Sequence, residues 1–387
     1  MVENKNMTTD EFEKKSGKAT IAATTVLFAI SLAGILFAGL WPFNFFPPNK
    51  VTWNQKENSL SFRRSSIAYI SEIPEEIGSE PGFTIDLKIK PLTRYPGSLP
   101  RILSIGRKKE EYLIIGQWKT GIVFRVFDTY LGEYNEVGYG KAFLSKKPVQ
   151  ITLSSGPHGT TIFIDGKAVR SYKKTLMSKY ARLGGTVVLG NNITGDQPWS
   201  GEFMHLSISQ GLYTPNTGSD SRNDLLRFDF TTKKQPEHYV SSGRYKDTQL
   251  IVPVRFSPPF KKVLTPFWID FKPDKHYLFD VILNLTGFIP SGFLLALILI
   301  LCKVKTRNAP IITFFVLASV SLTIELLQVT LPSRTSQLSD LILNGSGGLI
   351  GGVIAIWFLR LKKRLLTAKV KTLPNRSLKT EMDLNGR

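Results

Sequence analysis

Four long apolar segments constrain the fold of this chain more than any other feature. They cover about residues 20–40, 278–301, 311–331 and 341–358. Each segment is close to the ~20 residues that an α-helix needs to cross a hydrocarbon core about 30 Å thick. The sequence therefore predicts an integral membrane protein with four spanning helices.

The first apolar segment has an alternative interpretation as a cleaved signal peptide. Its apolar run exceeds the usual core of about 7–15 residues, and Leu40-Trp41-Pro42 follows without a small-residue cleavage site. We therefore expect an uncleaved membrane anchor.

Basic residues flank the four segments unevenly, and this asymmetry predicts an orientation. They lie before the first segment, between the second and third, and after the fourth: Lys14, Lys15, Lys18, Lys303, Lys305, Arg307, Arg360, Lys362, Lys363 and Arg364. Four spans place all these flanks on one side. We expect a multi-pass protein of the inner (cell) membrane, with a cytoplasmic N-terminal tail (1–19), a basic cytoplasmic C-terminal tail (360–387) and residues 51–255 outside.

The formal net charge of +20 raises the question of nucleic-acid binding. Much of the excess lies in the C-terminal tail, where anionic lipid of the cytoplasmic leaflet attracts Lys and Arg. No zinc-finger spacing or aromatic-basic RNA motif accompanies the charge, so we expect the lipid bilayer and not nucleic acid as the partner. Cys302 is the sole cysteine, which excludes an intrachain disulfide.

Between residues 51 and 255 the pattern changes to short alternating apolar runs. Examples are FTIDLKIKP from Phe83, YLIIGQW from Tyr112 and TTIFIDGKAV from Thr160. Gly, Pro, Asn and Asp separate the runs at hairpin-like spacing. The pattern predicts an all-β antiparallel jelly-roll sandwich inserted between the first two membrane helices.

The order of these runs resembles the concanavalin A-like lectin and laminin-G (LamG-type) superfamily. The resemblance rests on FTIDLKIKP, on ITLSSGPHGTTIFIDGKAV, on VVLGNN and on WSGEFMHLSIS. It implies carbohydrate binding or glucanase activity. The hydrolases of this fold need two carboxylates about 5 Å apart, and the chain has no Glu-x-Asp-x-Glu strand, so we do not expect a glycosidase.

Two features of this segment are candidate ligand sites. The oxygens of Asn191, Asn192 and Asp196 could hold calcium, although Asn and Asp in a loop are more often turn formers. Trp199 could stack on a sugar or cap the core. No other cofactor is expected.

The last three apolar segments carry acid and amide groups near one end. These are Asp280 and Asn284, Glu325 and Gln328, then Asp340 and Asn344, with Arg334 in the preceding loop. Spacings of three or four residues place each pair on one helix face. A carboxylate costs about 2.5–3.5 kcal/mol at mid-bilayer, so we expect the pairs to converge on a polar cluster, with Arg334 bridging the carboxylates.

These residues, together with Gly287-Phe288-x-Pro290-x-Gly292 and Gly347, resemble the VanZ family over residues 271–358. The resemblance implies a bacterial envelope membrane protein. The family is named for low-level resistance to the glycopeptide teicoplanin, and no established biochemical activity comes with it.

Small residues and a proline are expected to shape the helices. Pro290 and Gly292 should interrupt the second span, and the spacings Gly347/Gly351 and Gly348/Gly352 should let the fourth helix pack closely.

Three functional classes fit the polar cluster. The first is binding of an envelope glycan or lipid-linked glycan at the outer face, which hydroxyl-rich ligands suit. The second is a membrane enzyme that uses Glu325 or Asp340 as a general base, and the third is a transporter, for which no inverted repeat is evident. A network that only holds the helices together is the structural alternative. We favour binding. Catalysis, calcium binding and oligomeric state are left open by the sequence.

Overall fold

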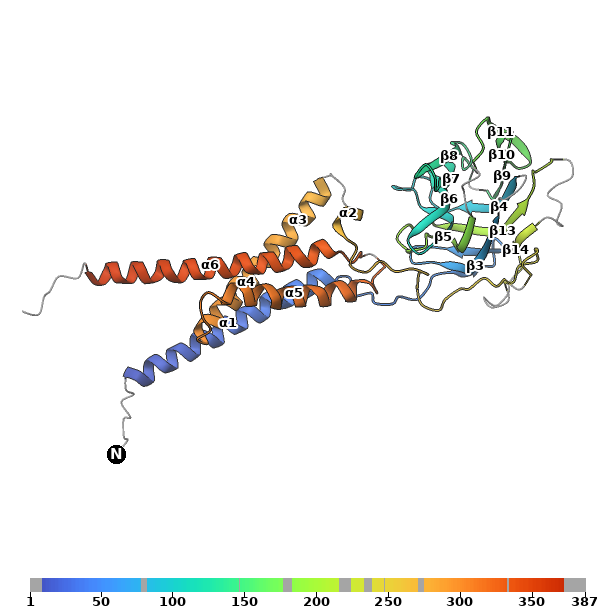
Figure 1. Ribbon diagram of the computed structural model, residues 1–387. Helices are drawn as coiled ribbons and strands as arrows, with labels where there is room; N and C mark the ends of the chain where they lie inside the picture. The colour runs from blue at the N-terminus through green and yellow to red at the C-terminus, as the bar shows by residue number, and fades with distance from the viewer. Residues whose placement is uncertain are drawn as a thin grey trace, which may run out of the picture. The chain divides into compact units, whose positions relative to one another are not determined.

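A computed structural model describes residues 9–77, 82–145, 147–176, 183–215, 224–232, 239–246, 248–270, 275–332 and 334–371. The chain forms two compact units (Figure 1). A helical unit comprises Met1–Phe43, Val263–Val329 and Thr335–Arg387, and a β unit comprises Asn44–Lys262 with Thr330–Arg334. The β unit is therefore inserted between the first helix and the later ones, as predicted. The end of the basic tail lies outside the described residues.

The β unit consists of two antiparallel sheets. The larger has the order β1-β2-β13-β4-β9-β10-β11, with β14 also paired to β13. Its strands are β1 (Thr52–Asn54), β2 (Ser59–Phe62), β4 (Phe83–Pro91), β9 (Val149–Gly156), β10 (Gly159–Ile164), β11 (Lys167–Tyr172), β13 (Gly201–Gln210) and β14 (Asp224–Asp229).

The second sheet has the order β3-β12-β5-β6-β7-β8. Its strands are β3 (Ala68–Ile77), β5 (Arg101–Arg107), β6 (Glu110–Trp118), β7 (Gly121–Asp128), β8 (Glu133–Tyr139) and β12 (Leu183–Leu189). Alternate residues of both sheets, such as Ile85 and Leu87 on β4 and Ile115 on β6, form one continuous apolar core. This confirms the predicted sandwich.

The β10–β11 hairpin shows how the local sequence sets a turn. Asp165 and Gly166 are its two central residues, with φ values of 49° and 78°. Two successive positive φ angles match the turn whose twist suits a two-residue hairpin, and Asp-Gly is a preferred pair there. The sequence IDGKAV thus gives the expected hairpin.

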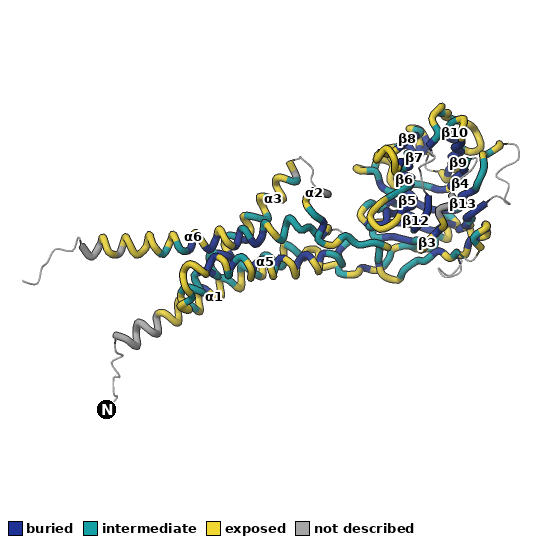
Figure 2. Tube along the Cα trace, in the orientation of Figure 1, coloured by how far each residue is buried: buried dark blue, intermediate teal, exposed yellow. Residues whose placement is uncertain are grey.

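The helical unit contains six described helices. They are α1 (Thr9–Leu40), α2 (Phe267–Asp270), α3 (Lys275–Gly287), α4 (Ile289–Leu301), α5 (Ala309–Gln328) and α6 (Leu338–Lys371). Four stretches are long and apolar enough to cross a membrane: Gly17–Leu40, Tyr277–Leu301, Ala309–Gln328 and Leu338–Leu365. Figure 2 shows exposed stretches along these helices. Large apolar side chains such as Phe315 and Trp357 are among the exposed residues, as lipid-facing residues are. The protein is a multi-pass membrane protein.

The second span is broken, as Pro290 and Gly292 predict. Helix α3 ends at Gly287, α4 begins at Ile289, and Pro290 lies in the first turn of α4. A proline is tolerated there because the first N–H groups of a helix have no intrahelical acceptor. A Cβ added to Gly292 would lie 2.2 Å from the Gly348 carbonyl oxygen, so the new helix starts in close contact with α6.

Two glycine faces on α6 let it pack between α5 on one side and α3 and α4 on the other. A Cβ at Gly351 would lie 2.2 Å from the Ile289 carbonyl oxygen, and one at Gly347 would lie 2.1 Å from the Leu285 carbonyl oxygen. On the other face, a Cβ at Gly352 would lie 2.8 Å from the Pro310 Cα. These separations are too short for any side chain, so α6 approaches its neighbours closely at the glycines.

We expect Gly351→Ala to lower the stability of the helical unit by about 1–3 kcal/mol, the usual cost of overpacking. The measurement is the thermal unfolding midpoint of the detergent-solubilised protein. Gly34→Ala on α1 is the matched control, because nothing lies within 4 Å of its added Cβ. Equal midpoints for the two variants would contradict the proposed role of the glycine faces.

Candidate functional site

Two of the predicted polar residues tie helix ends together. The Glu325 side chain on α5 is buried, and its Oε2 accepts a hydrogen bond of 2.7 Å from the Gln337 backbone N–H, directly before α6. Gln328 Nε2 donates to the Gly39 carbonyl at 2.9 Å, near the end of α1. Both contacts satisfy backbone groups that helix termini leave unpaired. Glu325 in this arrangement fits a structural role better than that of a general base.

Asn344 joins α6 to α5 from inside the bundle. Its side chain is buried, and Nδ2 donates to Ser321 Oγ at 2.8 Å. Its Oδ1 has no hydrogen-bond partner in the part of the chain that the structure describes. Together with Glu325 and Gln328, Asn344 gives α5 polar contacts to α1, to the start of α6 and to the body of α6.

A second, more accessible group consists of Asp280, Asn284 and Asp340. We call its two carboxylates, Asp280 and Asp340, the α3–α6 acid pair. Asp340 Oδ1 lies 3.3 Å from the Ser339 hydroxyl, and the Asn284 side chain also hydrogen bonds to the Asp340 carboxylate. The Asp280 carboxylate is close enough to Asp340 for electrostatic repulsion. Asp280 is exposed, whereas Asn284 and Asp340 are half-buried. The group offers hydrogen-bond acceptors and negative charge to a ligand.

The predicted single cluster is thus two arrangements with different burial. Sequence spacing identified which residues share a helix face, but it did not separate the buried ties from the accessible pair. Arg334 is exposed in the loop before α6. Its bridging of the carboxylates stays a prediction.

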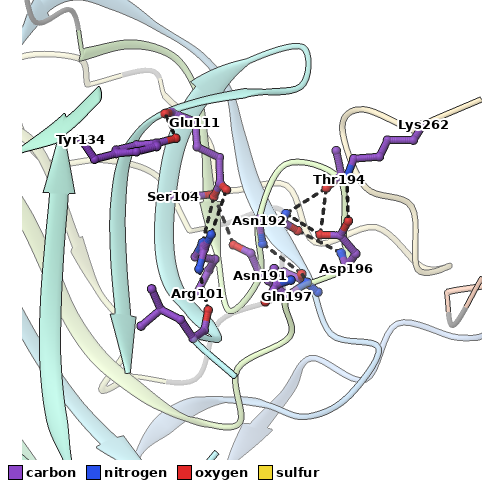
Figure 3. Close-up of polar contacts among 11 residues, drawn as sticks. Arg101, Ser104, Glu111, Tyr134, Asn191, Asn192, Thr194, Asp196, Gln197 and Lys262 are labelled. Carbon is purple, nitrogen blue, oxygen red and sulfur yellow. Dashed lines mark hydrogen bonds and ion pairs between the residues drawn. The ribbon is translucent and has the colours of Figure 1, made fainter. Parts of the chain in front are cut away.

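In the β unit, Asn191, Asn192 and Asp196 form one loop held by its own hydrogen bonds (Figure 3). Asn191 Oδ1 accepts from the backbone N–H groups of Asn192 and Gln197, both at 3.0 Å. Asn192 Oδ1 accepts from the Asp196 N–H at 2.9 Å. This is the bonding of a turn former.

Asp196 itself pairs with Lys262, whose Nζ lies 3.1 Å from Oδ2. Burial by itself would raise the pKa of Asp196, but Lys262 and hydrogen bonds from Asn192 and Thr194 outweigh burial and lower it. The carboxylate is therefore neutralised by a cation of the chain. Over the described residues there is no group of three or more His, Cys, Asp or Glu that could hold a metal ion. Calcium binding stays a prediction.

Beside this loop lies a second ion pair, which no pattern in the sequence had indicated. Arg101 contacts both carboxylate oxygens of Glu111, at 3.2 and 3.3 Å (Figure 3). Burial raises the pKa of Glu111, and Arg101 offsets this only in part. The pair joins β5 to β6, which are neighbours in the sheet, so only the strand pairing brings the two residues together.

Trp199 belongs to the core, which corrects the prediction of a sugar contact. Its side chain is 1% exposed, its ring centroid lies 5.3 Å from that of Phe203, and its Nε1 donates to Gln117 Oε1 at 2.9 Å. A ring buried on both faces offers no surface for stacking. The alternative interpretation, a cap on the core, is the one that its position supports.

Glu202 is a fully buried carboxylate that sequence analysis missed. It accepts hydrogen bonds from the Ser59 hydroxyl at 2.8 Å, the Ser61 hydroxyl at 3.1 Å and Asn54 Nδ2 at 3.2 Å, and Arg63 lies 3.5 Å away. These partners come from β1, β2 and the residue after it. A buried charge needs such partners, and the network fastens the edge strands to β13.

Comparison with known proteins found a family match for the C-terminal part of the chain. Residues 225–360 match the family model described as VanZ/LLP1. The match covers less than half of this chain. The match includes the α3–α6 acid pair, Glu325, Asn344 and the glycine faces, and it begins at β14, earlier than the resemblance over residues 271–358.

Solved structures resemble the β unit at low identity. They include the receptor binding domain of botulinum neurotoxin C/D mosaic serotype (13% identity, TM-score 0.36, covering 44% of this chain and 43% of that chain). Another is the binding domain of botulinum neurotoxin serotype G (12% identity, TM-score 0.36, covering 44% and 43%). The aligned part spans less than half of each of those proteins. The comparison with curated proteins found no match.

We expect Asp196→Asn to reduce the loss of stability that the β unit undergoes when the pH is lowered. The native pKa of Asp196 is lowered, so the native state favours the carboxylate. The stability it contributes is complete above the ordinary Asp pKa of about 3.9 and is lost as pH falls below that value. The measurement is the change in unfolding midpoint between about pH 6 and pH 3, followed by tryptophan fluorescence.

Glu133→Gln, which removes an exposed carboxylate on β8, is the control for this comparison. The change in midpoint should be smaller for Asp196→Asn than for the wild type and for Glu133→Gln. An identical pH dependence in all three proteins would show that the Asp196–Lys262 pair contributes nothing to stability.

Proposed function

We propose that this protein is a bacterial cell-envelope membrane protein that binds a glycan or lipid-linked glycan at the outer face of the membrane. The observation that carries the proposal is the α3–α6 acid pair, in which Asp280 and Asp340 come together from two helices beside Asn284. Carboxylate and amide oxygens are the acceptors that the hydroxyl groups of a sugar require. Carboxylates in a membrane-spanning helix are costly, which supports a functional reason for their presence.

The position of the pair along the helices supports an outward-facing site. Asp280 lies in the second turn of α3 and Asp340 in the first turn of α6. The basic loop that contains Lys303 and Lys305 follows the opposite end of the same span. If basic loops are cytoplasmic, the acid pair opens toward the outside, where envelope glycans and lipid-linked head groups are found.

The role we infer follows from this location. The VanZ resemblance suggests a contribution to glycopeptide resistance of the teicoplanin type, or to processing of envelope polysaccharide. Binding of a lipid-linked glycan by the acid pair would affect either process, because both act on the carbohydrate that surrounds the membrane. The buried contacts of Glu325 and Gln328 supply the rigid frame that such a site needs.

The proposal is tested by mass spectrometry of lipids that co-purify with the full chain. We expect a glycolipid or polyprenyl-linked sugar with the wild type, reduced about tenfold in Asp280→Asn and Asp340→Asn, as for loss of a hydrogen bond to a charged group. Glu325→Gln is the comparison variant, since Glu325 is turned to the Gln337 backbone; it should lose thermal stability but keep the lipid. The same lipids in all proteins, or none in any, would leave the acid pair a structural element only.

The orientation is tested with the natural cysteine. Cys302 is exposed at the end of α4, so a membrane-impermeant maleimide should label it in inverted vesicles and not in intact cells. In a Cys302→Ser background, Ser145→Cys in the β unit should show the opposite pattern, because Ser145 is also exposed. Labelling of Cys302 in intact cells would reverse the predicted topology.

A further inference from the structure

A cleft of about 490 Å³ lies on the β unit. It shares no residue with the α3–α6 acid pair. It is formed by β9, β10, β11 and the segment after β13, with the lining residues Ser154, His158, Thr161, Phe163, Ser171, Lys173 and Tyr213 among others. The size is within the range of about 300–1,000 Å³ that small-molecule sites occupy. Figure 1 shows these strands at one edge of the larger sheet.

The floor of the cleft is the outer face of that sheet. Leu153 and Ile162 point into the sandwich core, so Ser154 and Thr161, one position along each strand, point outward. The Thr161 and Ser171 hydroxyls lie 3.1 Å apart, and Ser154 Oγ accepts from the Tyr213 N–H at 2.9 Å. Each hydroxyl has further donor or acceptor capacity, so the floor can hydrogen bond to a polyol.

One wall of the cleft is aromatic. The rings of Phe163 and Tyr213 meet edge to face, with centroids 4.9 Å apart. Phe163 is buried and supports Tyr213, which is half-buried. A fixed aromatic ring beside hydroxyl groups provides an apolar surface together with polar groups that set orientation, as ligand sites do.

The rim is basic. Lys173 is exposed directly after β11 and has no carboxylate partner among the described residues, and His158 lies in the β9–β10 turn at the same end of the strands. Between residues 141 and 182 the sequence contains nine Lys and Arg and one acid, Asp165. Asp165 accepts from the Gln150 N–H at 3.0 Å at the far end of the β10–β11 hairpin, and the described lining contains no carboxylate.

We infer that this cleft binds an anionic glycan, a saccharide that carries phosphate or carboxylate groups. The hydroxyl floor and Tyr213 would contact the sugar, and Lys173 would contact the anionic group, since hydrogen bonds to charged groups are the stronger ones. The inference rests on the proposed function in that the ligand is a glycan. It adds to that function a second binding site, which lies in the β unit, and it specifies that the ligand is negatively charged.

The test uses the full chain in nanodiscs of phosphatidylcholine, which contain no lipid-linked glycan. The probes are fluorescent oligogalacturonate, a malto-oligosaccharide of the same length, and polyphosphate as an anion without sugar. We expect oligogalacturonate to bind best. Lys173→Glu should weaken it about tenfold, as for loss of a charge-assisted hydrogen bond. Tyr213→Ala should weaken it as well. Lys109→Glu, the same charge change on an exposed turn of the other sheet, should not.

Several outcomes would overturn the inference. Equal weakening by Lys109→Glu would indicate a general effect of surface charge. If the neutral oligosaccharide binds equally well and Lys173→Glu does not weaken it, the ligand is not anionic. If polyphosphate binds and Tyr213→Ala does not weaken it, the cleft is an anion site without sugar recognition. Binding lost in Asp280→Asn and kept in the cleft variants would move the glycan to the acid pair, so the proposed function would stand and this inference would fail. No binding of any probe also overturns it.

Discussion

Close packing of α6 against α3, α4 and α5 is the constraint on which the helical unit depends. The carbonyl oxygens of Leu285 and Ile289 occupy the space that side chains at Gly347 and Gly351 would fill. Lipid tails are as apolar as leucine, so helices in a membrane gain from contact mainly through such tight packing and through hydrogen bonds. The same packing fixes the rotation of α6, which brings Asp340 toward Asn284 and Asn344 toward Ser321.

The polar residues of the spans fall into two groups with different roles. Glu325 and Gln328 satisfy backbone groups of Gln337 and Gly39 at helix ends, and the cost of burying them is offset by those bonds. Asp280 and Asp340 repel each other and stay partly accessible. Two carboxylates that repel each other add little to helix packing, which is the physical reason for proposing a ligand site at that pair.

The β unit places its charges differently. Glu202 and the Asp196 loop are closed by hydrogen bonds and cations of the chain, so they stabilise strands and turns. The β9–β11 edge has the opposite character, with exposed Lys173 and hydroxyl groups around a cleft.

The sequence by itself determined the four spans, the break before Pro290, the Asp165-Gly166 hairpin and the glycine faces of α6. These depend on apolar length, proline chemistry and residue size, which are local properties. Only the tertiary structure decided that Glu325 is a helix tie, that Trp199 is core, that Arg101 meets Glu111 and that Ser154, Ser171 and Tyr213 line one cleft. Those outcomes depend on which strands and helices become neighbours. Period and composition indicate which face of an element is polar, but not which partner lies across from it.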